Sequence, residues 1–315
     1  MNKTSRRTFV KQMGMVSAAT MFPFASEAKR EILEEKSAPH RILSANIRVA
    51  LPEDSEKGFG WESRKDICVK IIRRHHPDII CMQEVLRVQN DDMRDCFPDF
   101  MPFGFDGPDM DAYPEGYHGI AKNVILVSRK RYDFISSGNY WLSETPLIAG
   151  SLSWNTARAR HCNWMRLKDK HTGKVFRILN THLDHISQDA RERQTQIILD
   201  ESRQYAADFP QILTGDFNSG MTNEVHKKIK TDGWIDSYSS LHGDLETGAT
   251  THGFLTNTRK QGGHRIDFIY TKGAVKSLVS EIIKDDINGR FPSDHDFIYT
   301  DVLFPEQPEQ QHQGS

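Results

Sequence analysis

This chain of 315 residues has little cysteine, little net charge and no long apolar run. Its four cysteines form no CxxC pair, and a chain of this size does not need disulfide bonds to support its core, so a disulfide scaffold is not expected. Cys68 and Cys81 lie within apolar stretches, and we interpret them as free core thiols. No internal repeat of fixed short period is present.

The formal net charge is only −2. This balance gives no electrostatic footprint for tight, non-specific binding to nucleic acid. It does not exclude a nuclease, because a local cleft can be basic on an acidic protein. The hydrophobic content of 37% is enough for one large domain with a substantial core.

The first 28 residues combine a basic region, a short apolar stretch and small residues near a plausible cleavage site. The pair Arg6-Arg7 precedes a Met- and Ala-rich stretch, 13–24, which Gly14 and Pro23 interrupt and which is too short for a membrane span. The pattern resembles a twin-arginine signal peptide over residues 1–28. We therefore expect export to the periplasm or the extracellular space, with no transmembrane span in the mature form. A basic disordered arm is the alternative.

The rest of the chain divides into three parts. Residues 29–39 read as a polar spacer, and residues 305–315, rich in Gln, Glu and Pro, as a disordered tail. Residues 40–304 are expected to form one domain, because polar groups suited to chemistry run from Asn46 to His295 without an obvious linker.

Short apolar runs dominate residues 40–304, with a few amphipathic helices between them. The predicted strands are 40–48, 78–82, 123–128, 175–181, 211–214, 265–271 and 297–303, and the predicted helices are 65–75 and 189–205. The stretch 104–119 carries acids, prolines and glycines and is expected to be a surface loop, and 129–131 an exposed turn. The pattern predicts two packed sheets with helices outside them, a layered α/β or α+β sandwich.

Polar residues follow several of these strands, where a rigid backbone can present them for chemistry. Glu84 comes directly after an apolar strand, and Asn46 ends another. A carboxylate in the position of Glu84 must face solvent, a partner or a metal, since burying it alone costs several kcal/mol. A solvated strand end remains the alternative for both residues.

Two histidines follow the strand 175–181. His182 and His185 are three residues apart, a spacing that a transition-metal pair can use on a helix. No matching third ligand cluster is evident, so one magnesium or manganese ion fits better than zinc. His182 is then a candidate acid or phosphate contact, and His185 a structural or supporting residue.

Two further pairs carry acids. Asp216 and Asn218, two apart after Gly215, can face one way and serve to align water and to donate to a negative oxygen, or can form a simple Asx turn. Asp267 lies inside an apolar run, where it needs a partner. His295 is the natural partner, because a carboxylate on one imidazole nitrogen makes the other a better base. The string 294–296 can also be a charged turn.

The ordered set of motifs resembles the endonuclease/exonuclease/phosphatase superfamily. The matching pieces are Asn46-Ile47-Arg48, Gln83-Glu84, Thr181 to His185, Gly215 to Asn218, Arg265 to Ile269 and Ser293 to His295, and they span nearly all of residues 40–304. Residues 141–146 also resemble a segment of the bacterial extracytoplasmic branch. One departure is Arg48, where family nucleases acting at abasic DNA sites often have an acid, which argues against DNA repair.

This resemblance implies a four-layer α/β sandwich with two central mixed β-sheets flanked by helices, and roles for nine residues. Mg²⁺ or Mn²⁺ would be held by Glu84 with Asn46 and Asp294. Asp216 would position the nucleophilic water, and Asn218 would bind a phosphoryl oxygen. His295, oriented by Asp267, would be the base or a transition-state contact. His182 would contact the phosphate or assist the leaving group, and Arg160 would contact the phosphate.

The expected activity is metal-dependent hydrolysis of a phosphomonoester or phosphodiester by a monomeric exported enzyme. A small organic phosphate, a sugar phosphate, a lipid headgroup or a nucleic acid would all fit as substrate. The alternatives are a secreted nuclease acting on DNA or RNA and, from another class, a catalytically silent binding module on the same fold. Aromatic residues of predicted loops, which either stack on a base or sugar or simply pack, are Phe59, Trp61, Tyr113, Tyr117, Trp141 and Trp154.

Overall fold

The computed structural model describes residues 38–116, 118–244, 248–255 and 263–305. The predicted signal peptide (1–28), nearly all of the predicted spacer (29–39) and all but the first residue of the predicted tail (305–315) lie outside these ranges, as does Tyr117. Among the described residues, no helix combines the length and the apolar character that crossing a membrane requires.

The described strands form two six-stranded sheets. The first sheet has the order β11 (Lys276–Ile283), β12 (Phe297–Leu303), β1 (His40–Asn46), β2 (Ile79–Gln83), β4 (Ile125–Ser128) and β3 (Phe100–Phe103). The second has the order β5 (Tyr132–Trp141), β6 (His161–Asp169), β7 (Val175–His182), β8 (Gln211–Asp216), β10 (Asp267–Lys272) and β9 (Ile235–Asp236). Each sheet is mixed, because β1 is parallel to β2 and β7 to β8 while the other pairs are antiparallel.

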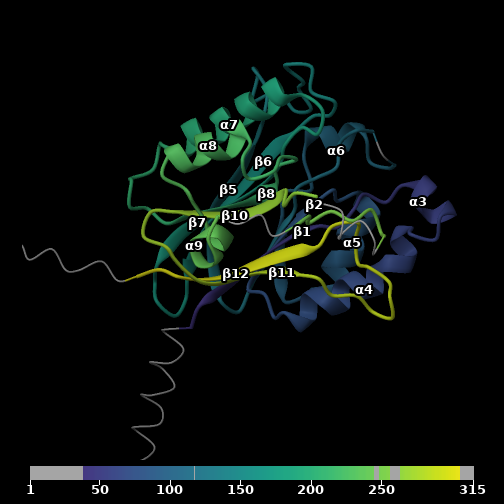
Figure 1. Ribbon diagram of the computed structural model, residues 1–315, viewed down its shortest axis with the longest axis horizontal. Helices are drawn as coiled ribbons and strands as arrows, with labels where there is room; N and C mark the ends of the chain where they lie inside the picture. The colour runs from purple at the N-terminus through teal and green to yellow at the C-terminus, as the bar shows by residue number, and fades with distance from the viewer. Residues whose placement is uncertain (1–37, 117, 245–247, 256–262, 306–315) are drawn as a thin grey trace, which may run out of the picture. The chain divides into compact units, whose positions relative to one another are not determined.

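Helices flank the two sheets (Figure 1). They are α3 (Pro52–Glu56), α4 (Trp61–Arg74), α5 (Arg87–Cys96), α6 (Pro108–Ala112), α7 (Gln188–Ser202), α8 (Glu224–Thr231) and α9 (Ser237–His242). Side-chain caps fix where three of them begin. Ser187 accepts a hydrogen bond from the amide of Ala190 at the start of α7, Asn223 from that of Val225 at the start of α8, and Asp236 from that of Tyr238 at the start of α9.

Three hydrophobic clusters define the layers. One cluster lies between the sheets and includes Ile42 and Ile79 from the first and Ile178 and Ile212 from the second. The other two pack α4 and α5 on the outside of the first sheet and α7 and α8 on the outside of the second. The molecule is therefore the predicted four-layer sandwich, with two mixed sheets flanked by helices.

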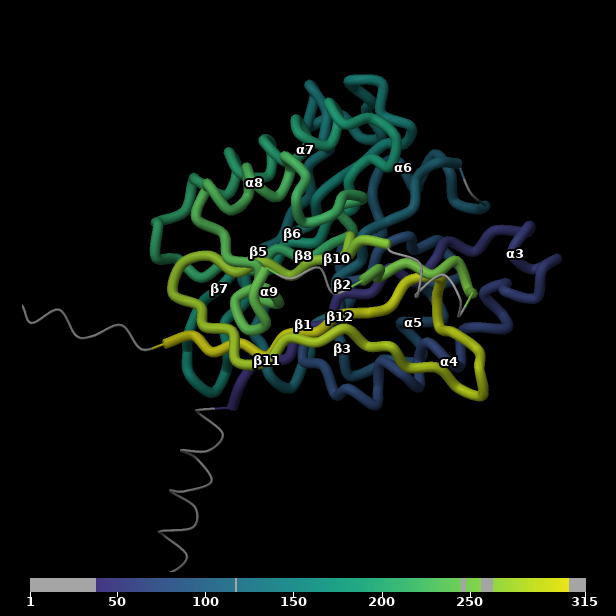
Figure 2. The backbone as a smooth tube through the Cα atoms, viewed as in Figure 1, coloured from purple at the N-terminus to yellow at the C-terminus, as the bar shows by residue number. Residues whose placement is uncertain are grey.

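Long-range pairing brings the two ends of the described chain together. In Figure 2, β1 and β12 lie side by side near the middle of the structure. They pair antiparallel, with Ser44 opposite Ile298, and β1 pairs parallel with β2 on its other side. This pairing places the segment before β12 beside the end of β1, which positions half of the site.

The local predictions are mostly confirmed, with bounds that move by a few residues at either end. The surface loop predicted over 104–119 is wrong in part, because α6 forms there. The exposed turn at 129–131 is also wrong in part: the Arg131 guanidinium is buried and donates to the Asp78 carboxylate at 2.6 Å. All four cysteines are free, and Cys68 and Cys81 are fully buried, as expected.

Candidate active site

The functional side chains meet at one edge of the sandwich because of how its strands pair. Parallel strands end at the same edge, so Asn46 and Gln83 lie together in one sheet and His182 and Asp216 in the other. Antiparallel pairing places the first residue of β10, Asp267, directly opposite Asp216. Above this edge lies a cleft of about 330 Å³.

The cleft is lined by most of the residues that the sequence singled out. It is lined by Glu84, Arg160, His182, Asp216, Asn218, Asp294 and His295, together with Arg48, Val49, Leu51, Gly119, Ala121, Arg158, Ala159 and His185. Two of the nine predicted site residues, Asn46 and Asp267, do not line it but hydrogen-bond to residues that do.

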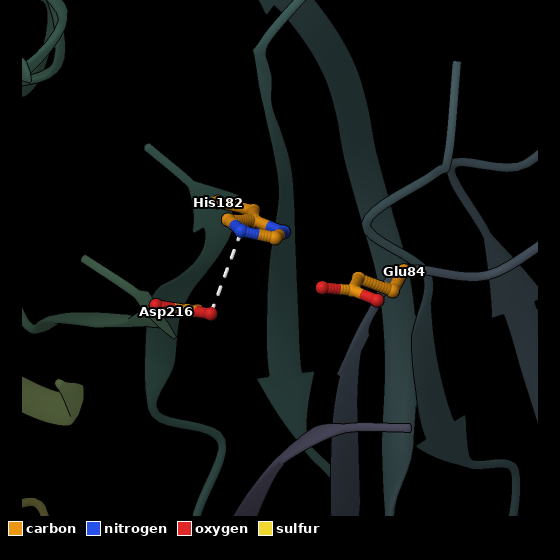
Figure 3. Close-up of side chains that lie close together, drawn as sticks. All are labelled: Glu84, His182 and Asp216. Carbon is orange, nitrogen blue, oxygen red and sulfur yellow. Dashed lines mark ion pairs between the residues drawn. The ribbon is translucent and has the colours of Figure 1, made fainter. Parts of the chain in front are cut away.

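Glu84 and Asp216 come from different sheets and point toward each other (Figure 3). Asn46 Nδ2 donates to Glu84 Oε1 and to Asp216 Oδ2, both at 3.0 Å. Glu84 has a positive φ of 63°, which turns its side chain out of the strand direction, and its Oε2 accepts from the amide of Val49 at 2.9 Å. The asparagine thus joins two carboxylates across the sheet interface.

Gly215 is needed just before Asp216 because β7 and β8 approach closely there. A Cβ at this position would lie 2.3 Å from the backbone oxygen of Thr181. Its absence lets Asp216 sit directly beside His182 in the parallel ladder.

Asp216 Oδ2 is the centre of the cluster. His182 Nε2 lies 3.4 Å from it and His295 Nε2 lies 3.8 Å from it. Asn218, which also has a positive φ (48°), donates its backbone amide to Asp216 Oδ1 at 2.8 Å and brings its Nδ2 to 2.9 Å from His182 Nε2. The turn after β8 therefore presents a carboxylate and a carboxamide to the same space.

His295 is oriented from behind by Asp267. Its Nδ1 lies 2.9 Å from Asp267 Oδ2, and both side chains are buried. Because Nδ1 faces this carboxylate, Nε2 faces Asp216 and the cleft. This is the carboxylate–imidazole pairing expected from the sequence.

Burial and crowding shift the pKa values of these groups. Burial, reinforced by the charge of Asp267, raises the pKa of Asp216 to about 7. Burial alone would lower the pKa of His295, but the carboxylates of Asp267, Asp216 and Asp294 raise it well above its usual value. Burial lowers the pKa of His182 well below its usual value, with Arg160 adding to the effect, so His182 is neutral.

The same crowding fits a divalent cation. Ligand atoms of Glu84, His182 and Asp216 all lie within 4.8 Å of one another. Burial raises the pKa of Asp294, and Glu84 adds to this effect. Hard cations prefer oxygen ligands, and a positive charge here would relieve the repulsion between buried carboxylates. Two further oxygen donors stand close by: Asn46, already bonded to Glu84, and Asp294 at the cleft wall.

Arginine side chains line the cleft beside this acidic cluster. Arg48 pairs with Asp54 at 2.8 Å and lies 3.4 Å from Asp294 Oδ2. On the side of β6, Arg160 Nη2 lies 3.2 Å from His185 Nδ1, and Arg158 lines the same wall. The cleft thus has acids that suit a metal and cations that suit an anionic group.

Sequence reasoning missed Arg158 and treated Arg48 only as a departure from a pattern. Arg158 is two residues before Arg160 in a segment without regular structure, and residues i and i+2 of extended chain share a face. That spacing was the available signal. The position of Arg48 against Asp294 depends on the pairing of β1 with β12, which no local pattern reveals.

Comparison with known proteins gives the family of this chain. A family model described as the endonuclease/exonuclease/phosphatase family matches residues 43–295. Nocturnin of Mus musculus is 26% identical over 303 residues, covering 86% of this chain and 67% of nocturnin.

Solved structures of similar proteins share this fold. An endonuclease/exonuclease/phosphatase family protein from Bacteroides thetaiotaomicron superposes with a TM-score of 0.74 at 27% identity, covering 86% of this chain and 99% of that one. A mannosyl-6-phosphatase from the same organism superposes with a TM-score of 0.74 at 28% identity, covering 84% and 100%.

Proposed function

Because the chain belongs to the endonuclease/exonuclease/phosphatase family, whose members hydrolyse phosphate esters, we propose that it is a divalent-metal-dependent phosphoesterase. The observation that carries the proposal is the convergence of Glu84 and Asp216, from different sheets, on one point that Asn46 bridges and His295 faces. A catalytically silent module would have no need for such a buried and mutually repelling set of acids.

The proposed reaction is attack of water on phosphorus. A new P–O bond forms to the water oxygen, the P–O bond to the leaving group breaks, and a proton from water ends on the leaving oxygen. Mg²⁺ or Mn²⁺, held by Glu84 with Asn46 and Asp294, would supply positive charge against the phosphoryl oxygens. The chain's own groups mainly position reactants and stabilise charge.

Each side chain has a task that follows from its surroundings. Asp216, at the centre of the cluster, holds the water and accepts its proton, which a pKa of about 7 suits. His295 keeps its positive charge beside Asp267 and stabilises the negative transition state. Asn218, His182 and Arg160 line the cleft and contact the phosphoryl oxygens; Asn218 Nδ2, which donates to His182 Nε2 in this structure, would turn to donate a hydrogen bond to the phosphate.

A panel of phosphoesters tests this proposal. The mature protein should hydrolyse p-nitrophenyl phosphate or bis-p-nitrophenyl phosphate with Mg²⁺ or Mn²⁺ and lose activity with chelator. Asp216→Asn should lower kcat by several powers of ten, whereas Leu147→Ala, which alters a side chain that is 94% exposed and outside the cleft, should not. Absence of metal-dependent turnover on every ester, with plasmid DNA and RNA included, would refute the proposal. Turnover of nucleic acid alone would favour the nuclease alternative.

We also propose that residues 1–28 direct export, on the strength of their basic, apolar and small-residue pattern. Replacing Arg6-Arg7 by a pair of lysines should keep the protein in the cytoplasm in a fractionation experiment. The mature chain is proposed to be a monomer, since one chain provides all the site residues, and light scattering after size exclusion measures this.

A further inference from the structure

A second pocket, of about 720 Å³, opens directly off the candidate active site. The two cavities share Gly119, Arg158 and Ala159 as lining residues. Its far wall is formed by α6 and by residues of the loop between β5 and β6. Its size is that of a cavity for an organic molecule, far larger than a phosphate group needs.

The strand order places this pocket beyond the β6 end of the cleft. In the second sheet the order β6–β7–β8 sets Arg160 (just before β6), His182 and Asp216 in a row along the cleft. The proposed water lies at Asp216, toward one end of this row, and the second pocket opens beyond the other end, next to Arg158. Attacking and leaving oxygens are roughly in line at phosphorus, so a water held at Asp216 would direct the leaving group toward the second pocket.

The chemistry of the pocket differs from that of the cleft. Its walls are largely apolar and include Pro108, Ile120 and Leu152. At its side Tyr113 stacks on His118, with ring centroids 4.7 Å apart and planes 24° apart. Tyr113 is 44% exposed and Leu152 is 61% exposed, so both offer apolar surface that the fold itself does not cover.

A buried ion pair holds the aromatic wall in place. Lys122 Nζ donates to Asp109 Oδ2 at 2.8 Å, with both side chains at most 2% exposed, and the Lys122 ammonium also lies over the ring of Trp141. The amide of Tyr113 donates to the Asp109 carbonyl at 3.2 Å. This anchoring ties α6 to the segment before β4, so that the pocket is formed before any ligand arrives.

Six aromatic residues were stacking candidates from the sequence, and Tyr117 is outside the described residues. Of the other five, Tyr113 is the one that lines the second pocket. Trp61 and Trp141 are buried in the fold, and Phe59 stacks on Phe254. Neither Phe59 nor Trp154 lines the cleft or the second pocket.

Resting on the proposed function, we infer that the second pocket binds a ring-bearing alcohol as the leaving group of the ester. A sugar and a nucleoside share the required chemistry, a flat face that packs on an aromatic ring. Tyr113 and Leu152 hold that face, and Arg158 stands where the ester oxygen enters the pocket. The selected substrates are therefore phosphate esters of ring-bearing alcohols, here called ring esters, rather than esters of open-chain alcohols such as glycerol phosphate.

The test compares ring esters with an open-chain ester. All are monoesters or all are diesters, according to which class the phosphoester panel shows to be hydrolysed. The esters are those of a hexose at its 6-position, of a nucleoside at its 5′-position and of glycerol. We expect at least one ring ester to exceed the glycerol ester in kcat/KM by roughly tenfold, since ring stacking and apolar contact are each worth about a factor of ten at most. The ring ester with the higher kcat/KM shows whether the pocket takes a sugar or a nucleoside.

Two variants decide whether the pocket causes the preference. Tyr113→Ala should reduce kcat/KM for the preferred ring ester roughly five- to tenfold, and Leu152→Ala roughly two- to fivefold, mainly through a higher KM. For the glycerol ester, kcat/KM should stay unchanged in both variants. Leu147→Ala is the matched control, because this exposed leucine lies on the same loop outside the pocket. Unchanged glycerol-ester turnover also shows that each variant is folded.

The outcomes separate this inference from the proposed function. If turnover is metal-dependent but shows no preference for ring esters, or if both variants keep that preference, the pocket assignment is wrong. The proposed phosphoesterase activity is then unaffected. Absence of turnover on every ester of the panel overturns both.

Discussion

Asp267→Asn is the substitution that most directly tests the arrangement of the site. It keeps the size of the side chain and its place at the start of β10, but removes the charge that faces His295 Nδ1 at 2.9 Å. It leaves the metal-binding set proposed at Glu84, Asn46 and Asp294 untouched. Any loss of activity would then come through the imidazole.

The magnitude follows from burial. Asp267 is 2% exposed and His295 is 7% exposed, so their interaction is poorly screened by water. Removing one partner of a buried pair costs about 3–5 kcal/mol. If that amount is lost from the transition state, at about 1.4 kcal/mol per tenfold change, kcat falls by about 10²–10⁴.

The pH profile gives a second readout. The charge of Asp267 raises the pKa of His295, and it adds to burial in raising the pKa of Asp216. Without that charge both pKa values fall, so the pH–rate profile should move to lower pH as its maximum drops. A variant that was merely destabilised would lose amplitude without this displacement.

The assay is steady-state hydrolysis from pH 5 to pH 10 at saturating Mg²⁺ or Mn²⁺, with thermal unfolding as a check on folding. A variant whose kcat stays within tenfold of the parent, or whose profile does not move, would refute the assignment of Asp267 as the residue that orients and charges His295.

Three further tests, with four substitutions, probe the frame around the site. Gly215→Ala should lower Tm and turnover together, because the new methyl group would lie 2.3 Å from the Thr181 carbonyl oxygen and push β7 away from β8. The expected loss of folding stability is about 1–3 kcal/mol. Since 1 kcal/mol shifts Tm by about 2–4 °C in proteins of this size, a Tm within about 1–2 °C of the parent would contradict this. Lys122→Met should cost about 3–5 kcal/mol in urea unfolding by leaving Asp109 charged and buried, and Lys122→Met with Asp109→Asn should recover much of it; equal stability of the two variants would count against the pair. Burial lowers the pKa of His226 from 6.5 to about 4, so the unfolded chain takes up the proton first and stability should fall by about 3 kcal/mol as pH drops from 6.5 to 4. His226→Gln should flatten that part of the urea-unfolding profile, and an unchanged slope would exclude His226 as its source.

Local sequence was a good guide to the elements that carry the site. The strands ending at Asn46, Gln83, His182 and Asp216 are short apolar runs followed by polar residues, a pattern that is legible without tertiary contacts. Strands β3, β5, β6, β9 and β11 were not predicted. β5, for example, exposes much of its length, so its sequence has no clear apolar alternation.

Some side chains could be placed only by contacts between distant segments. Arg48 looked like a departure from a family pattern, yet it pairs with Asp54 and faces Asp294. Arg158 gave no signal beyond its spacing from Arg160. Lys122 and Asp109, thirteen residues apart in a stretch that reads as loop, proved to be a fully buried pair.

The sequence by itself determined which chemical groups are present, that several of them follow a strand, and which family the chain resembles, because composition, periodicity and motif order are properties of the chain alone. Only the tertiary structure decided that Glu84 and Asp216 face each other, that Asp267 lies behind His295, and that a second pocket opens beside Arg158. Those facts depend on how the two sheets pair their strands and pack face to face, and no local stretch of sequence encodes the distance between residues 170 positions apart, such as Asn46 and Asp216.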